Sequence, residues 1–535
     1  MPLRGGRPAE LAPFVGLEKG VRASPARQLE DGMTVIRTRT FPRRGTLVSS
    51  LAALTLLAAL QPAFAATGAE ALAARDARNK EASARLMGPS DSPPAPPTAH
   101  YNHIITFGQS LASAAEGWPA LSREPGYDNL MLGEATRSAT YSGPRFVPVG
   151  EAAFKPLRAV VQAKADAKVL LGDEQTAEFE EHAQDEGESV EVGALNMARR
   201  LYLRDKGASA DPQHLFVASN AATSGRSLAQ LSHTGGTDEY QRVIQAVQQA
   251  RALAESGNTR YAVSALFWLQ GEFDYAEVNG GVNDKLRYKA GLRKLREDLN
   301  TDIAAITGQP QAPAFLSYQT DAKSSKDPDS LAIGMAQWEL ANEEPHWYLV
   351  GPVYPYTDKG THLSSNGYRW FGQMLGKVYH RVVVEGRGWR PLSPLGASHD
   401  GREVLVDFHV PYPPLAFDKP YIAHQARDIP DRGFELHDER GRVPLARVEL
   451  AADTVVRLTA SRELVGTPRV VYAGKRAGGA GALRDSDPTV ADAVYEYRAE
   501  AGMWRSENVA ERVGKPYPLQ NWSIAFELSA EPASP

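Results

Sequence analysis

The sequence predicts an α/β fold with a mostly parallel sheet, followed by a C-terminal all-β, sandwich-like domain. Two observations lead to this prediction. From about residue 101 to 385, apolar strand candidates alternate with amphipathic helical stretches. After about residue 390, short alternating segments separated by Gly, Pro and Asp turns replace them. Because strands separated by helices favour a parallel sheet covered on both faces, an α/β domain is expected at 101–390 and a β domain at 391–535.

The elements follow from apolar runs and their spacing. Strands of the first domain are expected at 103–107, 214–219, 261–269, 312–318 and 346–353. Helices are expected at 192–205, 239–257 and 284–308, where apolar residues recur at helical spacing. Strands of the second domain are expected at 402–410, 454–460, 469–474 and 522–528. Since ligands of parallel α/β sheets bind at the carboxyl ends of the strands, we expect the site among the residues that follow each strand.

The N-terminal part has the features of an export signal. Residues 43–66 contain an arginine pair, an apolar run and a small-x-small site, and the run is shorter than the ~20 residues that a bilayer span needs. We expect an over-called start at 1–32, a signal peptide at about 33–65, and a linker at 66–100, where prolines accumulate. The mature protein is therefore predicted to be periplasmic or secreted, without a membrane span, by the general or the twin-arginine route.

The amino-acid composition excludes several classes of partner and of catalytic group. The chain has 535 residues, of which 42% are hydrophobic, which is enough for two or more domain cores. Its formal net charge of -5 offers no basic excess for nucleic acid or an anionic membrane surface. It has no cysteine, which excludes thiol nucleophiles, thiolate metal ligands and disulfides. A nucleophile must therefore be an oxygen or an amine.

Polar blocks follow several of the expected strands. Gly108-Gln109-Ser110 follows the first strand, a block with Gly225 follows the second, and Gln-Gly-Glu-Phe-Asp at 270–274 follows the third. Late in the domain, the segment 356–375 carries His362 just before an amphipathic helix. The carboxyl ends of parallel strands lie at one edge of a sheet, so these blocks are expected to form one site.

These blocks, in this order, resemble the SGNH (GDSL-like) hydrolase family, in the branch of sialate O-acetylesterases and acetyl xylan esterases. The resemblance covers about residues 101–385. It implies a three-layer, flavodoxin-like SGNH hydrolase domain and a serine acyl-enzyme mechanism. It also implies that neither a cofactor nor a metal is needed.

The resemblance assigns the catalytic roles. Ser110 is the expected nucleophile, at a strand end where backbone N-H groups can stabilise an oxyanion, although a plain turn or helix cap is the alternative. His362 is the expected base. The family's acid lies three residues before the histidine, whereas Asp358 lies four before His362, with Lys359 inserted. We expect Asp358 to orient the ring through a one-residue bulge, and the alternative is a dyad in which a backbone carbonyl holds the histidine.

The oxyanion hole is expected to consist of the N-H groups of Ser110 and Gly225 and a third donor. In the family's Gly-x-Asn-Asp block an asparagine supplies this donor, but Phe273 stands at that position here. We expect the amide of Gln270 to replace it.

Three further polar side chains are expected to bind substrate: Gln109, Glu272 and Asp274. For Gln109 the alternatives are that it orients its loop or caps it. As an alternative, Glu272 and Asp274 would form a carboxylate pair for glycoside hydrolysis. The acidic stretch 173–191 lacks the spacing of a calcium loop, so we expect a solvated insertion rather than a metal site.

The sequence thus predicts an exported serine esterase that removes acetyl or other small acyl groups from an acylated carbohydrate. One alternative is a lipid or lysophospholipid esterase of the same fold. A second alternative is a catalytically silent carbohydrate-binding envelope protein.

Overall fold

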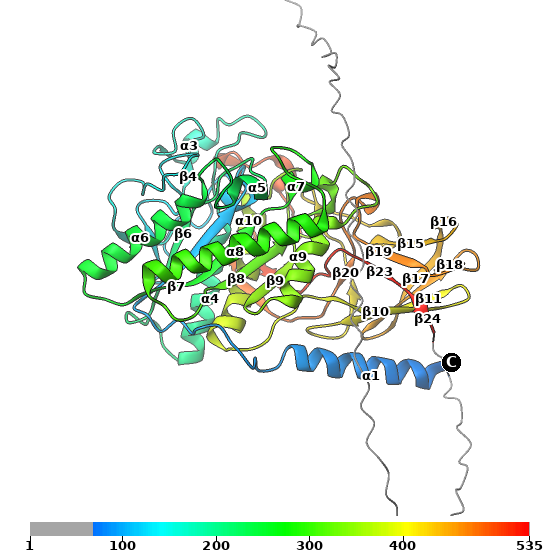
Figure 1. Cartoon of the computed structure of the whole chain (residues 1–535). Coiled ribbons are helices and arrows are strands. Elements are labelled where there is room, and N and C mark those ends of the chain that lie inside the picture. Colours follow the sequence, from blue (N-terminus) through cyan, green and yellow to red (C-terminus); the bar gives the residue numbers. More distant parts are fainter. Residues whose placement is uncertain (1–67, 534–535) are drawn as a thin grey trace, which may run out of the picture. The chain divides into compact units, whose positions relative to one another are not determined.

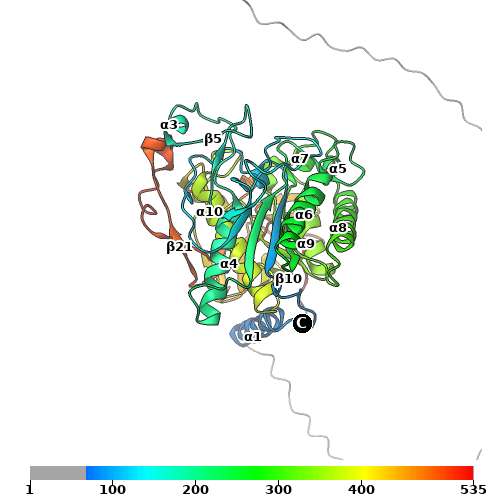
Figure 2. The ribbon, with the colours of Figure 1, turned by 90° about the vertical axis from the view of Figure 1, so that its left-hand side faces the viewer.

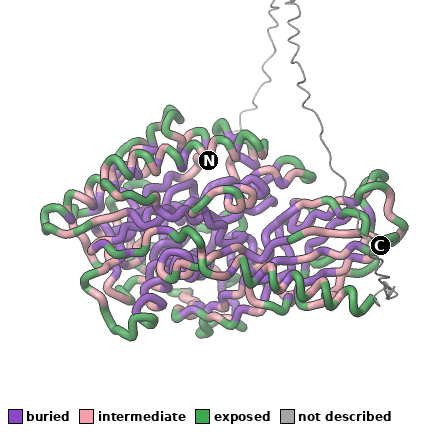
Figure 3. The backbone as a smooth tube through the Cα atoms, turned by 60° about the horizontal axis from the view of Figure 1, so that its bottom comes forward, coloured by how far each residue is buried: buried purple, intermediate pink, exposed green. Residues whose placement is uncertain are grey.

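The computed structural model describes residues 68–533, so the expected start and signal peptide lie outside the described residues. The described residues 68–533 lie in one compact unit. Within it, buried residues fill the interior of an α/β region and of a strand-rich C-terminal region (Figure 3). No helix of the described part has both the length and the apolar character needed to cross a bilayer.

The α/β region is built on a sheet of seven strands in the order β3-β2-β6-β1-β7-β8-β9. Figures 1 and 2 show this sheet between layers of helices. Its five long strands are parallel, and numbered along the chain they follow the order 2-1-3-4-5 of flavodoxin-like folds. The short β2 extends the parallel set, and β3 pairs with it antiparallel. The bounds are β1 Tyr101–Gly108, β2 Leu130–Leu132, β3 Phe154–Pro156, β6 Leu215–Asn220, β7 Tyr261–Leu269, β8 Ala314–Gln319 and β9 Trp347–Pro352. Each of the five predicted strands is thus confirmed within two residues.

Helices cover both faces of this sheet because successive strand residues point to opposite sides. Ile104 packs on the face covered by α4 and α10, whereas Ile105 packs on the face covered by α6, α8 and α9 (Figure 2). The bounds are α4 Val190–Lys206, α6 Tyr240–Ser256, α8 Lys285–Thr307, α9 Ala332–Glu343 and α10 Ser365–Tyr379. The helices α4 and α10 approach closely because Gly372 has no side chain: a Cβ there would lie 2.4 Å from the Val190 carbonyl oxygen.

The C-terminal region is rich in strands, as predicted. One sheet has the order β17-β18-β11-β10-β24 and another the order β16-β15-β19-β23. They share an apolar core that also takes in Met335 and Tyr354 of the α/β region. The strands of the two sheets are β10 Ser393–Asp400, β11 Glu403–His409, β15 Phe434–Asp438, β16 Gly441–Val443, β17 Leu445–Ala452, β18 Val455–Ala460, β19 Arg469–Tyr472, β23 Phe526–Ser529 and β24 Glu531–Pro532.

The stretch expected as a linker at 66–100 contains a helix. Residues Gly68–Leu86 form α1, which lies along the strand-rich region (Figure 1). Arg75 donates to Asp407 over 2.6 Å, and the Thr454 hydroxyl donates to Asp76 over 2.8 Å. The prolines begin only at Pro89, so the Ala-, Arg- and Glu-rich part before them has the helix propensity to form α1.

Candidate active site

Ser110 lies where β1 ends and the four-residue helix α2, Ser110–Ser113, begins. The preceding Gly108 allows this turn, because its φ is +148° and a Cβ would lie 2.1 Å from the Leu269 carbonyl oxygen. As the first residue of a helix, Ser110 has an N-H group without an acceptor inside that helix. The structure therefore places Ser110 at the carboxyl edge of the sheet with its N-H available.

A cavity of about 600 Å³ opens beside Ser110. Ser110, Gly225 and His362 all line it, so the structure brings together the predicted nucleophile, one predicted oxyanion donor and the predicted base. No hydrogen bond joins Ser110 to His362 among the described residues, which is common in catalytic pairs without substrate. The remaining lining residues are Gln109, Leu111, Tyr141, Lys164, Gln184, Ser224, Glu272, Phe273, Lys323, Ser324, Gly360 and Thr361.

His362 lies in the loop before α10, and its ring is held by Glu116. The Nδ1 of His362 donates to the Glu116 Oε1 over 2.7 Å. Since a carboxylate only accepts, this bond places the proton on Nδ1 and leaves Nε2 as the basic nitrogen. The α10 end of the loop is fixed by Ser364, whose hydroxyl caps the helix by accepting from the Gly367 N-H over 3.2 Å.

Glu116 is buried and ionised. The Nδ1 of His182 donates to its other oxygen over 3.0 Å, and the Gln184 amide donates to Oε1 over 2.7 Å. Burial raises the pKa of the Glu116 carboxyl, but the hydrogen bonds from His362 and His182 outweigh it and lower this pKa to about 2. Glu116 is therefore a carboxylate at any pH at which an esterase would be measured.

The prediction that Asp358 orients His362 is wrong. Asp358 Oδ1 accepts from the backbone N-H groups of Gly360 and Ala423, over 2.6 and 3.3 Å. The reason is the inserted Lys359: residues 358 and 363 pair as an antiparallel bridge, and the Lys359 N-H donates to the His362 carbonyl oxygen over 2.7 Å. Within the described residues the Asp358 carboxylate makes no hydrogen bond to the imidazole, and Glu116 is the carboxylate that holds the ring.

The prediction that Gln270 completes the oxyanion hole is also wrong. Gln270 is fully buried, and its amide nitrogen donates to Asp274 over 2.5 Å. Its amide oxygen accepts from the Tyr288 hydroxyl over 2.9 Å. Both ends of the side chain are thus used inside the fold, and Gln270 does not line the cavity.

Gln109 is better placed for that role. Its Oε1 accepts from the N-H groups of Gly271 and Phe273, over 3.3 and 3.4 Å. Those two donors fix the amide orientation and leave its NH₂ end without a partner in the described chain, in a residue that lines the cavity.

Glu272 and Asp274 do not form a carboxylate pair. Both Glu272 oxygens accept from the Tyr318 hydroxyl over 2.5 Å, and this residue lines the cavity. Asp274 instead accepts from the Leu228 N-H over 2.9 Å and is absent from the cavity lining. The two side chains diverge because they lie in a helical turn, α7 Glu272–Tyr275, rather than on a strand. This corrects both the glycosidase alternative and the prediction that Asp274 binds substrate.

The acidic stretch at 173–191 is not simply a solvated insertion. Glu188 is buried and accepts from the N-H groups of Leu121 and Ser122, each over 2.8 Å. Glu191 is also buried and accepts from the Ser189 hydroxyl over 2.7 Å. These acids satisfy buried backbone and hydroxyl donors around the loop that carries Glu116.

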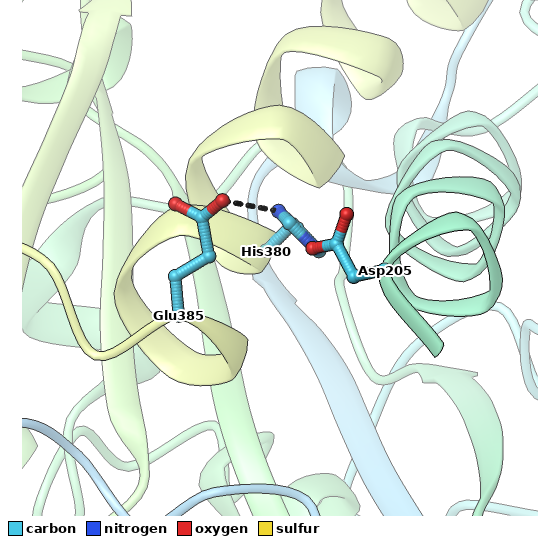
Figure 4. A group of neighbouring side chains, drawn as sticks. All are labelled: Asp205, His380 and Glu385. Atoms are coloured by element: carbon cyan, nitrogen blue, oxygen red, sulfur yellow. Dashed lines mark ion pairs between the residues drawn. The ribbon is translucent and has the colours of Figure 1, made fainter. Parts of the chain in front are cut away.

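Within residues 68–533, one group of His, Asp and Glu side chains lies close enough to share a cation: Asp205, His380 and Glu385 (Figure 4). It lies at the other end of α10 from His362, about 20 Å along the helix axis. Asp205 lies 2.8 Å from Nε2 of His380 and Glu385 lies 3.8 Å from Nδ1, so the carboxylates face different ring nitrogens. Asp205 also pairs with Arg204 over 2.8 Å. The arrangement is that of an imidazole between two carboxylates.

Sequence reasoning missed Glu116. It lies six residues after Ser110 in a turn, with a φ of +62°, and no spacing rule links such a turn to a histidine near residue 362. The sequence holds one indication against Asp358: the inserted Lys359 breaks the Asp-x-x-His spacing of the family, which leaves room for another carboxylate to hold the histidine.

Part of the chain matches a known protein family. Residues 208–381 match the family described as carbohydrate esterase, sialic acid-specific acetylesterase. This segment includes Gly225 and His362 but not Ser110 or Glu116. No curated protein sequence matches the chain.

Several solved structures are similar to this chain, among them the following three. A carbohydrate acetylesterase from Xanthomonas citri is 12% identical with a TM-score of 0.45, over 71% of this chain and 77% of that one. A protein from Arabidopsis thaliana is 14% identical with a TM-score of 0.35, over 52% and 97%. A carbohydrate acetylesterase from Sinorhizobium meliloti is 15% identical with a TM-score of 0.26, over 53% and 99%.

Proposed function

We propose that the chain is a carboxylic ester hydrolase that removes acetyl or other small acyl groups from carbohydrate, with Ser110 as the nucleophile. The match of residues 208–381 to a family of carbohydrate esterases supports this proposal. The proposal includes an SGNH-type three-layer fold, a sandwich-like C-terminal domain and export from the cytoplasm. The observation that carries it is the 2.7 Å bond between His362 Nδ1 and Glu116, which leaves Nε2 as the basic nitrogen of a histidine that lines the same cavity as Ser110.

The proposed reaction has two steps. Ser110 Oγ attacks the acyl carbonyl carbon while His362 Nε2 takes the hydroxyl proton, and Glu116 stabilises the imidazolium that forms. The imidazolium then gives this proton to the sugar oxygen as the ester bond breaks and the acyl-serine remains. A water molecule, deprotonated by the same His362, hydrolyses the acyl-serine and releases the acid.

The oxyanion would be stabilised by three donors. The Ser110 N-H at the start of α2 has no acceptor among residues 68–533, and the Gly225 N-H lies in a turn with a φ of +75° that favours glycine. The third donor is the NH₂ of Gln109, which backbone donors hold in one orientation.

We expect Gln109→Leu to lower kcat by about 100-fold or more, because a lost oxyanion donor typically costs that much. Gln270→Leu is the matched amide-to-apolar control, and its kcat is expected to stay within about tenfold once the protein is folded. Steady-state kinetics on a chromogenic acetate ester, with thermal melts of both variants, measure the difference. A kcat that falls more for Gln270→Leu than for Gln109→Leu would return the donor role to Gln270.

The function is tested by measuring acetate released from a panel of acetylated mono- and oligosaccharides and from a chromogenic acetate ester. Long-chain acyl esters and lysophospholipids form a second arm. The proposal expects acetate release with the sugars preferred. Preference for the long-chain arm would favour the lipid esterase instead, and glycan binding without any hydrolysis would favour the silent binding protein.

A further inference from the structure

We propose that the strand-rich C-terminal region is a working part of the esterase site: its Glu507 holds Lys359, and this pair sets the position and the electrostatics of the loop that carries His362. Lys359 and Glu507 are thus positioning residues. The inference rests on the proposed function, since its readout is hydrolysis through His362.

Lys359 joins the two loops of the site. It immediately follows Asp358, and its N-H donates to the His362 carbonyl oxygen over 2.7 Å. Its side chain is fully buried, and Nζ donates to the Trp118 carbonyl oxygen over 3.1 Å and lies 3.6 Å from the centre of the Trp118 ring. Trp118 lies two residues after Glu116 in the chain. A single side chain therefore connects the loop of the base to the loop of the acid.

The partner of this buried cation comes from the C-terminal region. Glu507 is also fully buried, and its Oε1 lies 3.6 Å from the Lys359 Nζ. The Trp504 N-H donates to the same oxygen over 3.0 Å and fixes the carboxylate. Glu507 and then Glu116 are the main negative charges that act on Lys359. Because a buried ammonium without a partner is costly, Glu507 is what allows Lys359 to lie between the two loops.

The same C-terminal segment also contacts the site and α10. The Trp504 ring packs edge-to-face on His182, the second histidine on Glu116, with ring centres 4.9 Å apart. All 15 residues of α10 are buried, because one side of the helix packs on α4 and another is covered by C-terminal residues. The Trp370 indole donates to the Pro518 carbonyl oxygen over 2.7 Å, and the Lys377 Nζ donates to that of Leu519 over 2.6 Å. The C-terminal residues therefore share a packed core with α10 and do not form a separate domain on a flexible linker.

Substitution of Lys359 and substitution of Glu507 are expected to shift the pH profile of hydrolysis in opposite directions. A base fails on the acid side of the pH profile, when His362 takes up a proton before it can accept the one from Ser110. Glu507→Gln leaves the charge of Lys359 unbalanced, which opposes protonation of His362 and moves the acid limb to lower pH. Lys359→Met leaves Glu507 unbalanced and moves the limb to higher pH. Burial lowers the pKa of Lys359 and raises the pKa of Glu507, so loss or uptake of a proton by the unpaired partner limits the size of both shifts.

The other charged groups near His362 are not substituted in these variants. His424 also lies near the pair of Lys359 and Glu507, and burial, followed by the charge of Lys359, lowers the pKa of its ring. Glu116 holds the Nδ1 of His362, and His182 lies on the other oxygen of Glu116. The charged side chains that line the cavities next to His362 are Lys164, Glu272, Asp321, Lys323 and Asp358. A difference between the two single variants therefore reports on Lys359 and Glu507.

The experiment is the pH profile of kcat/KM on a chromogenic acetate ester for the full chain, Glu507→Gln, Lys359→Met and the double variant. We expect shifts of the acid limb of about half a pH unit or more, in opposite directions for the single variants. The double variant should return the limb to the parent position but keep a kcat at least about tenfold lower, with KM little changed, because the link between the loops is gone. The matched control is Glu527→Gln, which breaks a surface pair with Arg469 in the same region and should change nothing.

The outcomes separate this inference from the proposed function. If the parent hydrolyses no ester, the proposed function has failed. If the parent is active and the single variants shift the limb in the same direction or not at all, the inference is overturned. If a single variant does not fold, the double variant decides: a folded protein with a lowered kcat supports the positioning role, and one with the parent's kcat refutes it.

Discussion

Ser110→Ala is expected to abolish esterase activity, with kcat lowered by at least about 1000-fold on every ester that the parent hydrolyses. Without the hydroxyl no acyl-serine forms, and what remains is hydrolysis by water assisted by the oxyanion donors. The variant should fold normally, because Ser110 Oγ makes no hydrogen bond within residues 68–533 and the smaller side chain fits the start of α2. Acetate release and a thermal melt, measured on the same preparation, separate loss of chemistry from loss of folding.

Ser324→Ala is the matched control for this variant. Ser324 lines the same cavity, so its removal deletes a hydroxyl from the same space without touching the proposed nucleophile. We expect its kcat/KM to stay within about tenfold of the parent. If Ser110→Ala keeps more than a tenth of the parental activity, the nucleophile is another group and the proposed mechanism is wrong.

Glu116→Gln is expected to have the second-largest effect, a loss of about 100- to 10,000-fold in kcat. A neutral amide cannot stabilise the imidazolium, and its NH₂ can donate to Nδ1 and so favour the tautomer whose Nε2 carries the proton. Asp358→Asn is the isosteric counterpart, and its kcat is expected to stay within about tenfold because an amide oxygen can still accept from Gly360 and Ala423.

The two variants are compared by steady-state kinetics at pH 7 to 8 and by their pH profiles. A larger loss for Asp358→Asn than for Glu116→Gln would restore the acid predicted from the family pattern. Equal and small losses would indicate a dyad in which Ser110 and His362 act without an acid.

Much of the α/β architecture could be predicted because its signals are local. The five parallel strands are apolar runs between polar turns, and β7 at Tyr261–Leu269 has the predicted bounds. The strands β2 and β3 have three residues each, too few to show a period, and were not predicted. The helix α1 was missed because the prolines after it were given more weight than the Ala-rich stretch before them.

Site residues could be predicted where they lie directly after a strand or directly before a helix. Ser110, Gly225 and His362 follow strands or precede a helix, the family resemblance singled them out, and the structure brings them to one cavity. The acid and the third oxyanion donor depend on which way a side chain turns in a loop. Gln270 and Gln109 are both amides near strand ends, and the difference lies in Asp274 and Tyr288, which bind the first inside the fold.

The position of α1 sets an order for the maturation of the chain. This helix is synthesised first among the described elements, but Asp407 and Thr454, with which it bonds, follow Arg75 and Asp76 by 332 and 378 residues. The chain emerges from N- to C-terminus, and α10 likewise gains its cover only when residues near 519 arrive. A nascent chain that ends before residue 519 would therefore contain Ser110, Glu116 and His362 but lack the contacts that cover α10, the helix that follows His362.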